Sequence, residues 1–281
     1  MSGLQRKIFL KIACLRKIAA FIKKDFLIQL SYPFSFIFSL FSILVTVATF
    51  YFISKLFGQE VTLHLKDYQT GYFPFVLIGI AFSGYLSTAI HSFSQNIRHE
   101  QIIGTLEAMM VTPTKLSILI ISMSLWDFLF TSITTVVYLL FGVLFFKVDL
   151  SQMNLLAALI ILILTIVSFS SIGIISASFI MVFKKGDPIS WLITTFSGFF
   201  GGVFFPISIL PKPLQTISYL FPITYSLRAL RQALLQGYSL KMLASDIGVL
   251  LVFCVVLLPL SIWIFKCAIK KAKQVGSLAH Y

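Results

Sequence analysis

The side chains that could do chemistry in this sequence are few and lie far apart. The chain has no HExxH or GxSxG motif and no paired cysteines or histidines at the spacing that metal sites use. His91 and His99 flank a polar loop without other ligand types at metal-site spacing, and Cys14, Cys254 and Cys267 are scattered. A phosphate-binding GxxxxGK(S/T) loop is also missing, so the chain cannot hydrolyse ATP by that route. We therefore expect no catalytic residue and no metal site.

The most informative polar stretch is residues 98–113, which lies between two apolar runs. Apolar residues such as Leu106 and Met110 recur there at helical spacing, with Glu100 and Glu107 on the flanks and a Thr-Pro pair at the end. A short amphipathic helix in a loop suits docking into the groove of a partner protein. The same pattern also fits packing against the chain's own surface.

Two features inside apolar runs have more than one interpretation. Asp127 lies roughly 16 Å along its run, at 1.5 Å per residue. A carboxylate at that depth costs about 2.5–3.5 kcal/mol, so it must face protein or water, as a cavity residue, an interface residue or the acceptor of a structural hydrogen bond. Gly198 and Gly202 form a GxxxG pair, which permits close helix packing between two copies or within one chain.

Composition places these residues in a membrane protein. Hydrophobic residues make up 58% of the 281 residues and charged residues only 11%, where soluble domains carry about 25%. Apolar runs reach about 18 residues or more, the length that crosses about 30 Å of hydrocarbon. The net charge of +13 could suggest nucleic acid, but basic residues of membrane proteins gather at the cytoplasmic face and meet anionic lipid there. We expect membrane lipid, and no nucleic acid, around these charges.

The apolar runs predict an all-α membrane protein of one domain, 1–281, with six transmembrane helices. An amphipathic helix over 1–30 precedes them and should lie in the membrane interface. Four prolines and an amphipathic stretch between the last two spans predict short extracytoplasmic helices. The predicted spans are 34–57, 71–93, 116–146, 155–183, 189–205 and 247–265, followed by a cytoplasmic tail over 266–281.

The distribution of lysine and arginine predicts the orientation. If both termini are cytoplasmic, the inside segments hold fifteen basic residues and the outside segments seven. Because basic residues are enriched on the cytoplasmic side, this bias places both termini inside, and an even number of spans agrees with it. The stretch 98–113 then lies in the cytoplasm.

Two segments of the chain resemble one known family. Residues 100–113 are similar to the signature E-x-x-x-G-T-L-E-x-x-x-x-T-P of type-2 ABC permeases, in the branch that includes antibiotic and multidrug exporters. A patch of small residues from Gly198 to Gly202 is followed by sequences similar to the family patterns F-F-P-x-x-x-L-P and P-x-T-Y-x-x-x-x-x-R. Arg231 takes the arginine position of the last pattern, and Arg228 is additional.

The resemblance implies a half-transporter rather than an enzyme. In this family two permease chains, as a homodimer or heterodimer, pair with two copies of an ATPase that is usually a separate polypeptide. ATP and magnesium would be used there, so no cofactor is expected in this chain. The stretch 100–113 would be the coupling helix seated on the ATPase at a bacterial inner membrane. The expected coupling residues are Glu100, Gly104, Thr105, Leu106, Glu107, Met110, Thr112 and Pro113.

The same resemblance implies export of a hydrophobic or amphiphilic cargo, such as a drug in multidrug efflux, a lipid or a lipid-linked glycan. We expect a membrane pathway or dimer interface at Asp127, Gly198, Gly202, Phe205 and Pro206. The extracytoplasmic motif comprises Pro222, Thr224, Tyr225 and Arg231.

Two other classes fit the composition less well. An ion-coupled secondary transporter usually shows paired intramembrane charges and internal repeats, whereas Asp127 stands alone in its run and no repeat is present. An intramembrane enzyme would need several convergent polar residues near the membrane surface, and the polar loops lack them.

Overall fold

The computed structural model describes residues 3–62, 65, 68, 70–105, 108, 111, 116–183 and 187–275, and every regular element in these ranges is a helix. Five helices contain segments long and apolar enough to cross a membrane. The prediction of an all-α membrane protein is therefore confirmed. The five segments are Pro33–Leu56, Tyr72–Glu100, Ile121–Phe146, Leu155–Phe183 and Ala244–Ala272.

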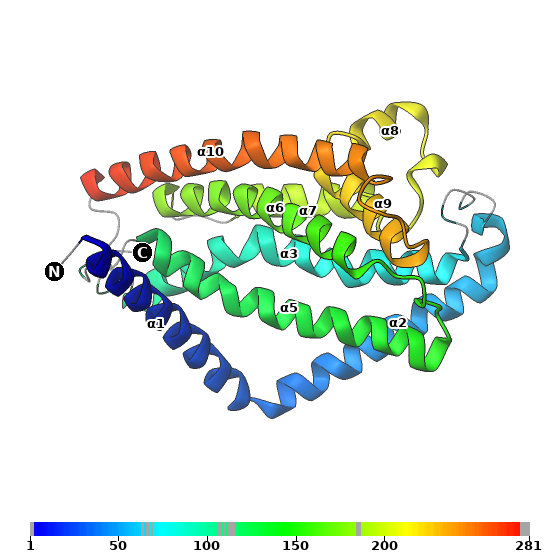
Figure 1. Cartoon of the computed structure of the whole chain (residues 1–281), viewed down its shortest axis with the longest axis horizontal. Helices are drawn as coiled ribbons and strands as arrows, with labels where there is room; N and C mark the ends of the chain where they lie inside the picture. Colours follow the sequence, from blue (N-terminus) through cyan, green and yellow to red (C-terminus); the bar gives the residue numbers. More distant parts are fainter. Residues whose placement is uncertain are drawn as a thin grey trace.

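Long helices form the body of the molecule (Figure 1). The start of α1, the end of α3 and the end of α10 lie at one end of the bundle, called here the terminal end. The connection between α5 and α6, with α8 and α9, lies at the opposite end, called here the distal end. The bounds are α1 Gly3–Leu30, α2 Pro33–Thr62, α3 Tyr72–Ile102, α5 Leu116–Phe146, α6 Leu155–Phe183 and α10 Ala244–Val275.

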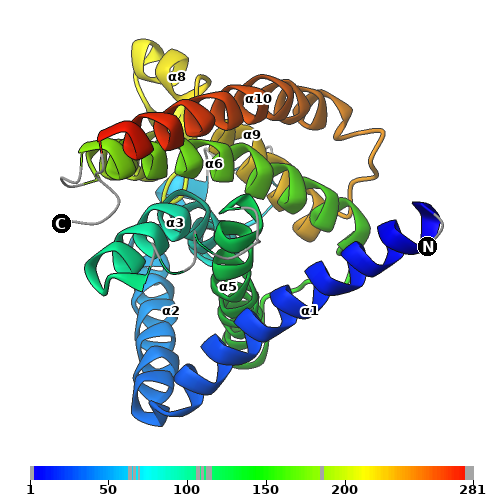
Figure 2. The ribbon, with the colours of Figure 1, turned by 90° about the vertical axis from the view of Figure 1, so that its left-hand side faces the viewer.

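Helix α3 is the core of the bundle. In its most apolar stretch 67% of the residues are buried, against 11% in α2 and 17% in α5 and α10. Figure 2 shows α3 between α2, α5 and α6, all of which contact it. The outer helices therefore turn most of their apolar side chains outward, as helices that face lipid do.

Close packing of α3 against α6 depends on a glycine. A Cβ atom added to Gly173 of α6 would lie 2.3 Å from the carbonyl oxygen of Ala89 and 2.8 Å from that of Ile90. By contrast, a Cβ atom on Gly84 of α3 would make an ordinary contact with Thr131, at 3.5 Å. The backbones of α3 and α6 thus approach each other more closely than any larger residue at Gly173 would allow.

The predicted fifth span, 189–205, coincides only in part with a helix. Helix α7 (Pro188–Phe200) has 13 residues, about 20 Å at 1.5 Å per residue and short of the roughly 30 Å of hydrocarbon. It ends where Gly201 donates to the Ser197 carbonyl at 2.8 Å and Gly202 takes a φ of 74°. Three short helices follow towards the distal end: η2 (Ile207–Ile209), α8 (Lys212–Ser218) and α9 (Pro222–Leu235).

We predict that Gly173→Ala destabilises the folded chain by about 1–3 kcal/mol, the usual cost of overpacking a tight contact. The added methyl group would push α6 away from the carbonyl groups of α3, which outweighs the higher helix propensity of alanine. Unfolding in mixed micelles measures the change, with Gly84→Ala as the matched control. Equal stability of the two variants would contradict the close approach.

Candidate functional site

The structure describes part of the predicted coupling segment, at the terminal end of α3. Glu100 is 6% exposed, and its carboxylate accepts a hydrogen bond from the hydroxyl of Thr105. Gly104, with a φ of 74°, turns the chain between them, while Ile102 and Ile103 are exposed. Glu100 therefore holds the turn, and its predicted contact with the ATPase stays a prediction. The remaining predicted coupling residues lie outside the described ranges: Leu106, Glu107, Met110, Thr112 and Pro113.

Asp187 links three helices at the same end. Its Oδ1 accepts a hydrogen bond from the backbone N–H of Ser190 at 3.0 Å, which caps α7, and another from the hydroxyl of Ser176 on α6. Its Oδ2 accepts from the hydroxyl of Ser94 at 2.6 Å and lies 3.8 Å from Nδ1 of His91, both on α3. One carboxylate thus fixes the start of α7 against α3 and α6.

The pKa of Asp187 reflects these contacts. Burial would raise the pKa, but the hydrogen bonds with His91, Ser176, Ser94 and Ser190 together hold it well below the usual carboxyl range. The group is therefore a carboxylate at neutral pH. The other ring nitrogen of His91, Nε2, lies 3.1 Å from the hydroxyl of Thr194 on α7 and extends the link between α3 and α7.

Arg231 of α9 is 2% exposed and lies where α3 begins and α7 has just ended. It donates from Nε to the carbonyl oxygen of Phe75 at 3.0 Å and from Nη2 to that of Val203 at 3.1 Å. The guanidinium also lies over the ring of Phe75, 3.4 Å from its centroid. Gly79 makes room for it, because a Cβ atom there would lie 2.6 Å from Nη2.

Arg231 keeps its charge despite this burial. Desolvation lowers its pKa to about 10, and the nearby Tyr68 acts in the opposite direction. The side chain is therefore a cation at neutral pH, and its partners among the described residues include two carbonyl dipoles and the face of an aromatic ring.

The additional arginine has a carboxylate partner of its own. Arg228 donates from Nε to Oδ2 of Asp246 at 3.1 Å and from Nη2 to Oδ1, a two-bond pair that ties α9 to the first turn of α10. This contact raises the pKa of Arg228 further above its ordinary value. The ring of Tyr225 lies 5.4 Å from the guanidinium.

The other motif residues build the turn before α9. Pro222 is the first residue of the helix, a position that needs no backbone donor. The hydroxyl of Thr224 donates to the carbonyl of Ser218 at 2.6 Å, and that of Tyr225 donates to the carbonyl of Tyr219 at 3.1 Å. These bonds join α8 to α9, so the motif acts through local structure.

Asp127 lies at a cavity between α3 and α5. The cavity holds about 310 Å³, and the amide of Asn96 donates to Oδ2 of Asp127 at 3.1 Å. Ser92, 5% exposed, lines the same cavity, and its hydroxyl has no hydrogen-bond partner. The other lining residues are Ser87, Thr88, His91, Gln95, Phe130 and Thr131.

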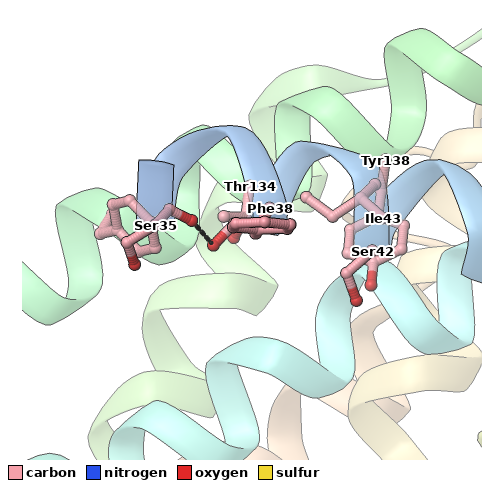
Figure 3. Close-up of a pocket in the computed structure, with 8 residues that line it drawn as sticks. Ser35, Phe38, Ser42, Ile43, Thr134 and Tyr138 are labelled. Carbon is pink, nitrogen blue, oxygen red and sulfur yellow. Dashed lines mark hydrogen bonds between the residues drawn. The ribbon is translucent and has the colours of Figure 1, made fainter. Parts of the chain in front are cut away.

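A second hollow adjoins it, between α2 and α5. It holds about 590 Å³ and shares Phe130 with the first cavity. Figure 3 shows Ser35, Phe38, Ser42 and Ile43 of α2 with Thr134 and Tyr138 of α5 around it. Hydroxyl groups and aromatic rings alternate along this surface.

Gly198 and Gly202 do not share one helix face. Gly202 lies in the turn beyond the end of α7, whereas a Cβ atom added to Gly198 would meet no atom within 4 Å. Phe205 packs edge-on against Phe199, with ring centroids 5.8 Å apart, and Pro206 is buried beside the turn. The structure therefore separates the two glycines, and an interface role stays a prediction for Gly198.

Among the described residues, five helices long and apolar enough to cross a membrane place the chain in the class of multi-pass membrane proteins. The chain belongs to the ABC-2 type transporter family, whose sequence profile matches residues 16–235. It is thus the membrane subunit of an ABC transporter, in the type-2 permease family that the two motifs indicated.

Curated relatives agree with the family. The inner membrane transport permease YadH of Escherichia coli strain K12 is 26% identical over 215 residues, which cover 75% of this chain and 81% of the relative. The permeases of the same description from Escherichia coli O157:H7 and Shigella flexneri match to the same extent. The apolar helices and these relatives together indicate a multi-pass inner-membrane protein.

Sequence reasoning missed the links made by Asp187 and Asp246. Asp187 stands in a Gly-Asp-Pro turn, and its partner His91 lies 96 positions earlier in the chain. An aspartate directly before a proline and an apolar run was a signal for a helix cap. No signal in the sequence paired Arg228 with Asp246.

We predict that Asp187→Ala destabilises the chain by about 2–4 kcal/mol at pH 7, because it removes a helix cap and charge-assisted hydrogen bonds. The folded pKa is depressed, so this stabilisation is complete above the ordinary carboxyl pKa of about 3.9 and is lost as the pH falls further. Unfolding in mixed micelles at pH 7 and pH 3 measures both effects. Asp149→Ala is the control, because Asp149 is exposed and accepts only a local bond from Ser151.

Proposed function

We propose that this chain is the permease subunit of an ATP-driven exporter and forms the membrane path for a hydrophobic or amphiphilic cargo. The family match over residues 16–235 carries the proposal, because it includes both motif segments. In this reading a separate ABC ATPase hydrolyses ATP, and the segment 100–113 contacts it. Drugs, lipids and lipid-linked glycans all fit such a path.

The position of the coupling segment supports this reading. The end of α3, the start of α1 and the end of α10 share the terminal end of the bundle (Figure 1). Ile102 and Ile103 are exposed there, 58% and 54%, in the one segment whose sequence resembles a coupling helix. The turn that the buried Glu100 holds through Thr105 presents these apolar side chains, so a partner protein could bury them.

Six crossings fit the course of the chain. Helices α2, α3, α5 and α6 alternate in direction, α6 finishes at the terminal end and α10 starts at the distal end (Figure 1). The chain must therefore cross once more between them, and we assign that crossing to α7 with residues 201–211. Irregular backbone is tolerated at membrane depth only where protein covers it, and Val203 is buried with its carbonyl bonded to Arg231. Both termini then lie on the same side of the membrane, which the bias of lysine and arginine assigns to the cytoplasm.

Two copies of the permease, or this chain with a second permease, would surround the path. Helix α7 turns large apolar side chains outward, among them Trp191, 67% exposed, and Phe199, 55% exposed. Gly198 leaves open space on the same helix. This surface suits contact with a second membrane subunit.

Affinity purification of the tagged chain from its native membranes in mild detergent tests the function. We expect a P-loop ATPase to co-purify in stoichiometric amount. Glu107→Lys should leave insertion unchanged but lower substrate-stimulated ATPase activity about tenfold or more, because it reverses the charge at one position of the coupling segment and cancels the segment's net negative charge.

Asp149→Lys is the matched control, since it makes the same charge change in an exposed residue of the connection between α5 and α6. If no ATPase co-purifies even after crosslinking, the proposed function is wrong. If Glu107→Lys keeps normal stimulated turnover, the coupling role of 100–113 is wrong.

Cysteine labelling tests the orientation. In a background with Cys14, Cys254 and Cys267 replaced by serine, a membrane-impermeant maleimide should label Lys212→Cys in intact cells and spare Lys270→Cys. Both positions are exposed on the protein, so permeabilised cells should label both. The reverse pattern in intact cells would overturn the assignment of the termini to the cytoplasm.

A further inference from the structure

We propose that the cavity at Asp127 binds the protonated amine of a cationic amphiphile, and that the adjoining groove between α2 and α5 binds its apolar body. The inference rests on the proposed export function and narrows its cargo to basic amphiphiles. In this proposal the carboxylate of Asp127 forms an ion pair with the protonated amine of the cargo.

Asp127 differs in its partners from two other aspartates, the half-buried Asp187 and the buried Asp246. Asp187 is held by hydroxyl groups, a backbone N–H and a histidine, and Asp246 by an arginine. Among the described residues no basic side chain forms an ion pair with Asp127, and its hydrogen-bond donor is the neutral amide of Asn96. A carboxylate inside a membrane helix is costly, and an ammonium group from a ligand would offset that cost.

The cavity is built to receive a polar group. Ser92 is buried at the wall of the cavity, and its hydroxyl has no hydrogen-bond partner among the described residues. A ligand with a hydrogen-bonding group could bond this hydroxyl and so remove the free-energy cost of leaving it unpaired. Both ring nitrogens of His91 already face Asp187 and Thr194. The one carboxylate among the described residues that line the cavity is that of Asp127, so an entering ammonium group would face it.

Volume and lining favour an amphiphile over a bare ion. The cavity and the groove hold about 310 and 590 Å³, within the range of roughly 300–1,000 Å³ for small-molecule sites. Among the described residues no three His, Cys, Asp or Glu side chains gather to hold a metal ion. Phe130 lines both hollows, so an aromatic ring stands between the carboxylate and the groove and suits an ammonium group attached to an apolar body.

The groove gives such a molecule access from the lipid. Phe38 at its rim is 69% exposed on α2, an outer helix, while Thr134 and Tyr138 lie across from it on α5 (Figure 3). An amphiphile dissolved in the membrane could slide its body along these side chains and place its amine at Asp127. The two hollows thus form one site with a charged end and a lipid-facing end.

A pair of fluorescent probes tests the proposal on the purified permease in phosphatidylcholine nanodiscs without ATP. Monodansylcadaverine carries a protonated amine, and its N-acetyl derivative has the same body without charge. We expect the wild type to bind the cation at least about tenfold more tightly after subtraction of binding to empty nanodiscs. Asp127→Asn keeps the shape of the side chain and an oxygen for Asn96. It should lower the affinity for the cation to that for the uncharged probe.

Two variants separate charge from shape. Asp149→Asn, at an exposed carboxylate of the distal end, should keep the preference for the cation. Thr134→Trp should fill the groove and weaken both probes by a similar factor while the preference remains. Equal affinity of the wild type for the two probes overturns the proposal even without any variant, as does a preference that survives Asp127→Asn.

The assay contains no ATPase, so its result is independent of the test of function. If an ATPase co-purifies but the probes bind equally, the exporter stands and the basic cargo is wrong. If no ATPase co-purifies, the exporter is wrong whatever the probes show.

Discussion

A guanidinium group buried between helices is the constraint on which the distal end of this permease depends. Arg231 bonds the carbonyl groups of Phe75 and Val203 and covers the ring of Phe75, so it joins α9, the start of α3 and the chain just after α7. A buried cation without such partners would cost several kcal/mol. The position of each of these segments is therefore tied to the other two. Gly79 is required because a Cβ atom there would clash with the backbone carbonyl of Val203 and with the guanidinium.

This contact also explains how α7 can end early. The backbone beyond Phe200 leaves the helix, and its polar groups need partners that lipid does not supply. Arg231 provides a donor to Val203, and the short helices η2, α8 and α9 cover the segment that follows. At the terminal end Asp187 fixes the start of α7, because it accepts hydrogen bonds from a backbone N–H of α7 and from hydroxyl groups of α3 and α6. Helix α7 is thus fixed at both ends by one charged side chain each.

The long helices were predictable from the sequence because their apolar runs exceed what a soluble fold could bury, and α2, α3, α5, α6 and α10 follow those runs. The end of α7 was not, because residues 201–205 are small or apolar and hydropathy continues through them. What ends the helix is the positive φ of Gly202, a backbone property that hydropathy does not record.

The candidate site likewise has residues that the sequence indicated and contacts that it did not. The family motif indicated Arg231, but its partners are backbone carbonyls at positions 75 and 203, which no side-chain pattern marks. Asp127 was noticeable as a lone charge in an apolar run. Its cavity was not, because Asn96 and Ser92 come from a helix distant in sequence. The motif also indicated Glu100, but no sequence pattern predicted that its carboxylate accepts a hydrogen bond from Thr105.

Three aspartates with three kinds of partner, Asp127, Asp187 and Asp246, differ in whether their charge serves the fold or is available to a ligand. Asp187 and Asp246 are each satisfied by several donors of the chain itself, so a ligand could reach them only by breaking links between helices. Asp127 receives one amide hydrogen bond and faces a cavity with an unpartnered hydroxyl, so a ligand there would add interactions without removing any that hold the bundle together. A transport site needs that property, because cargo must bind and leave while the helices stay assembled. Among these three carboxylates only Asp127 meets this requirement.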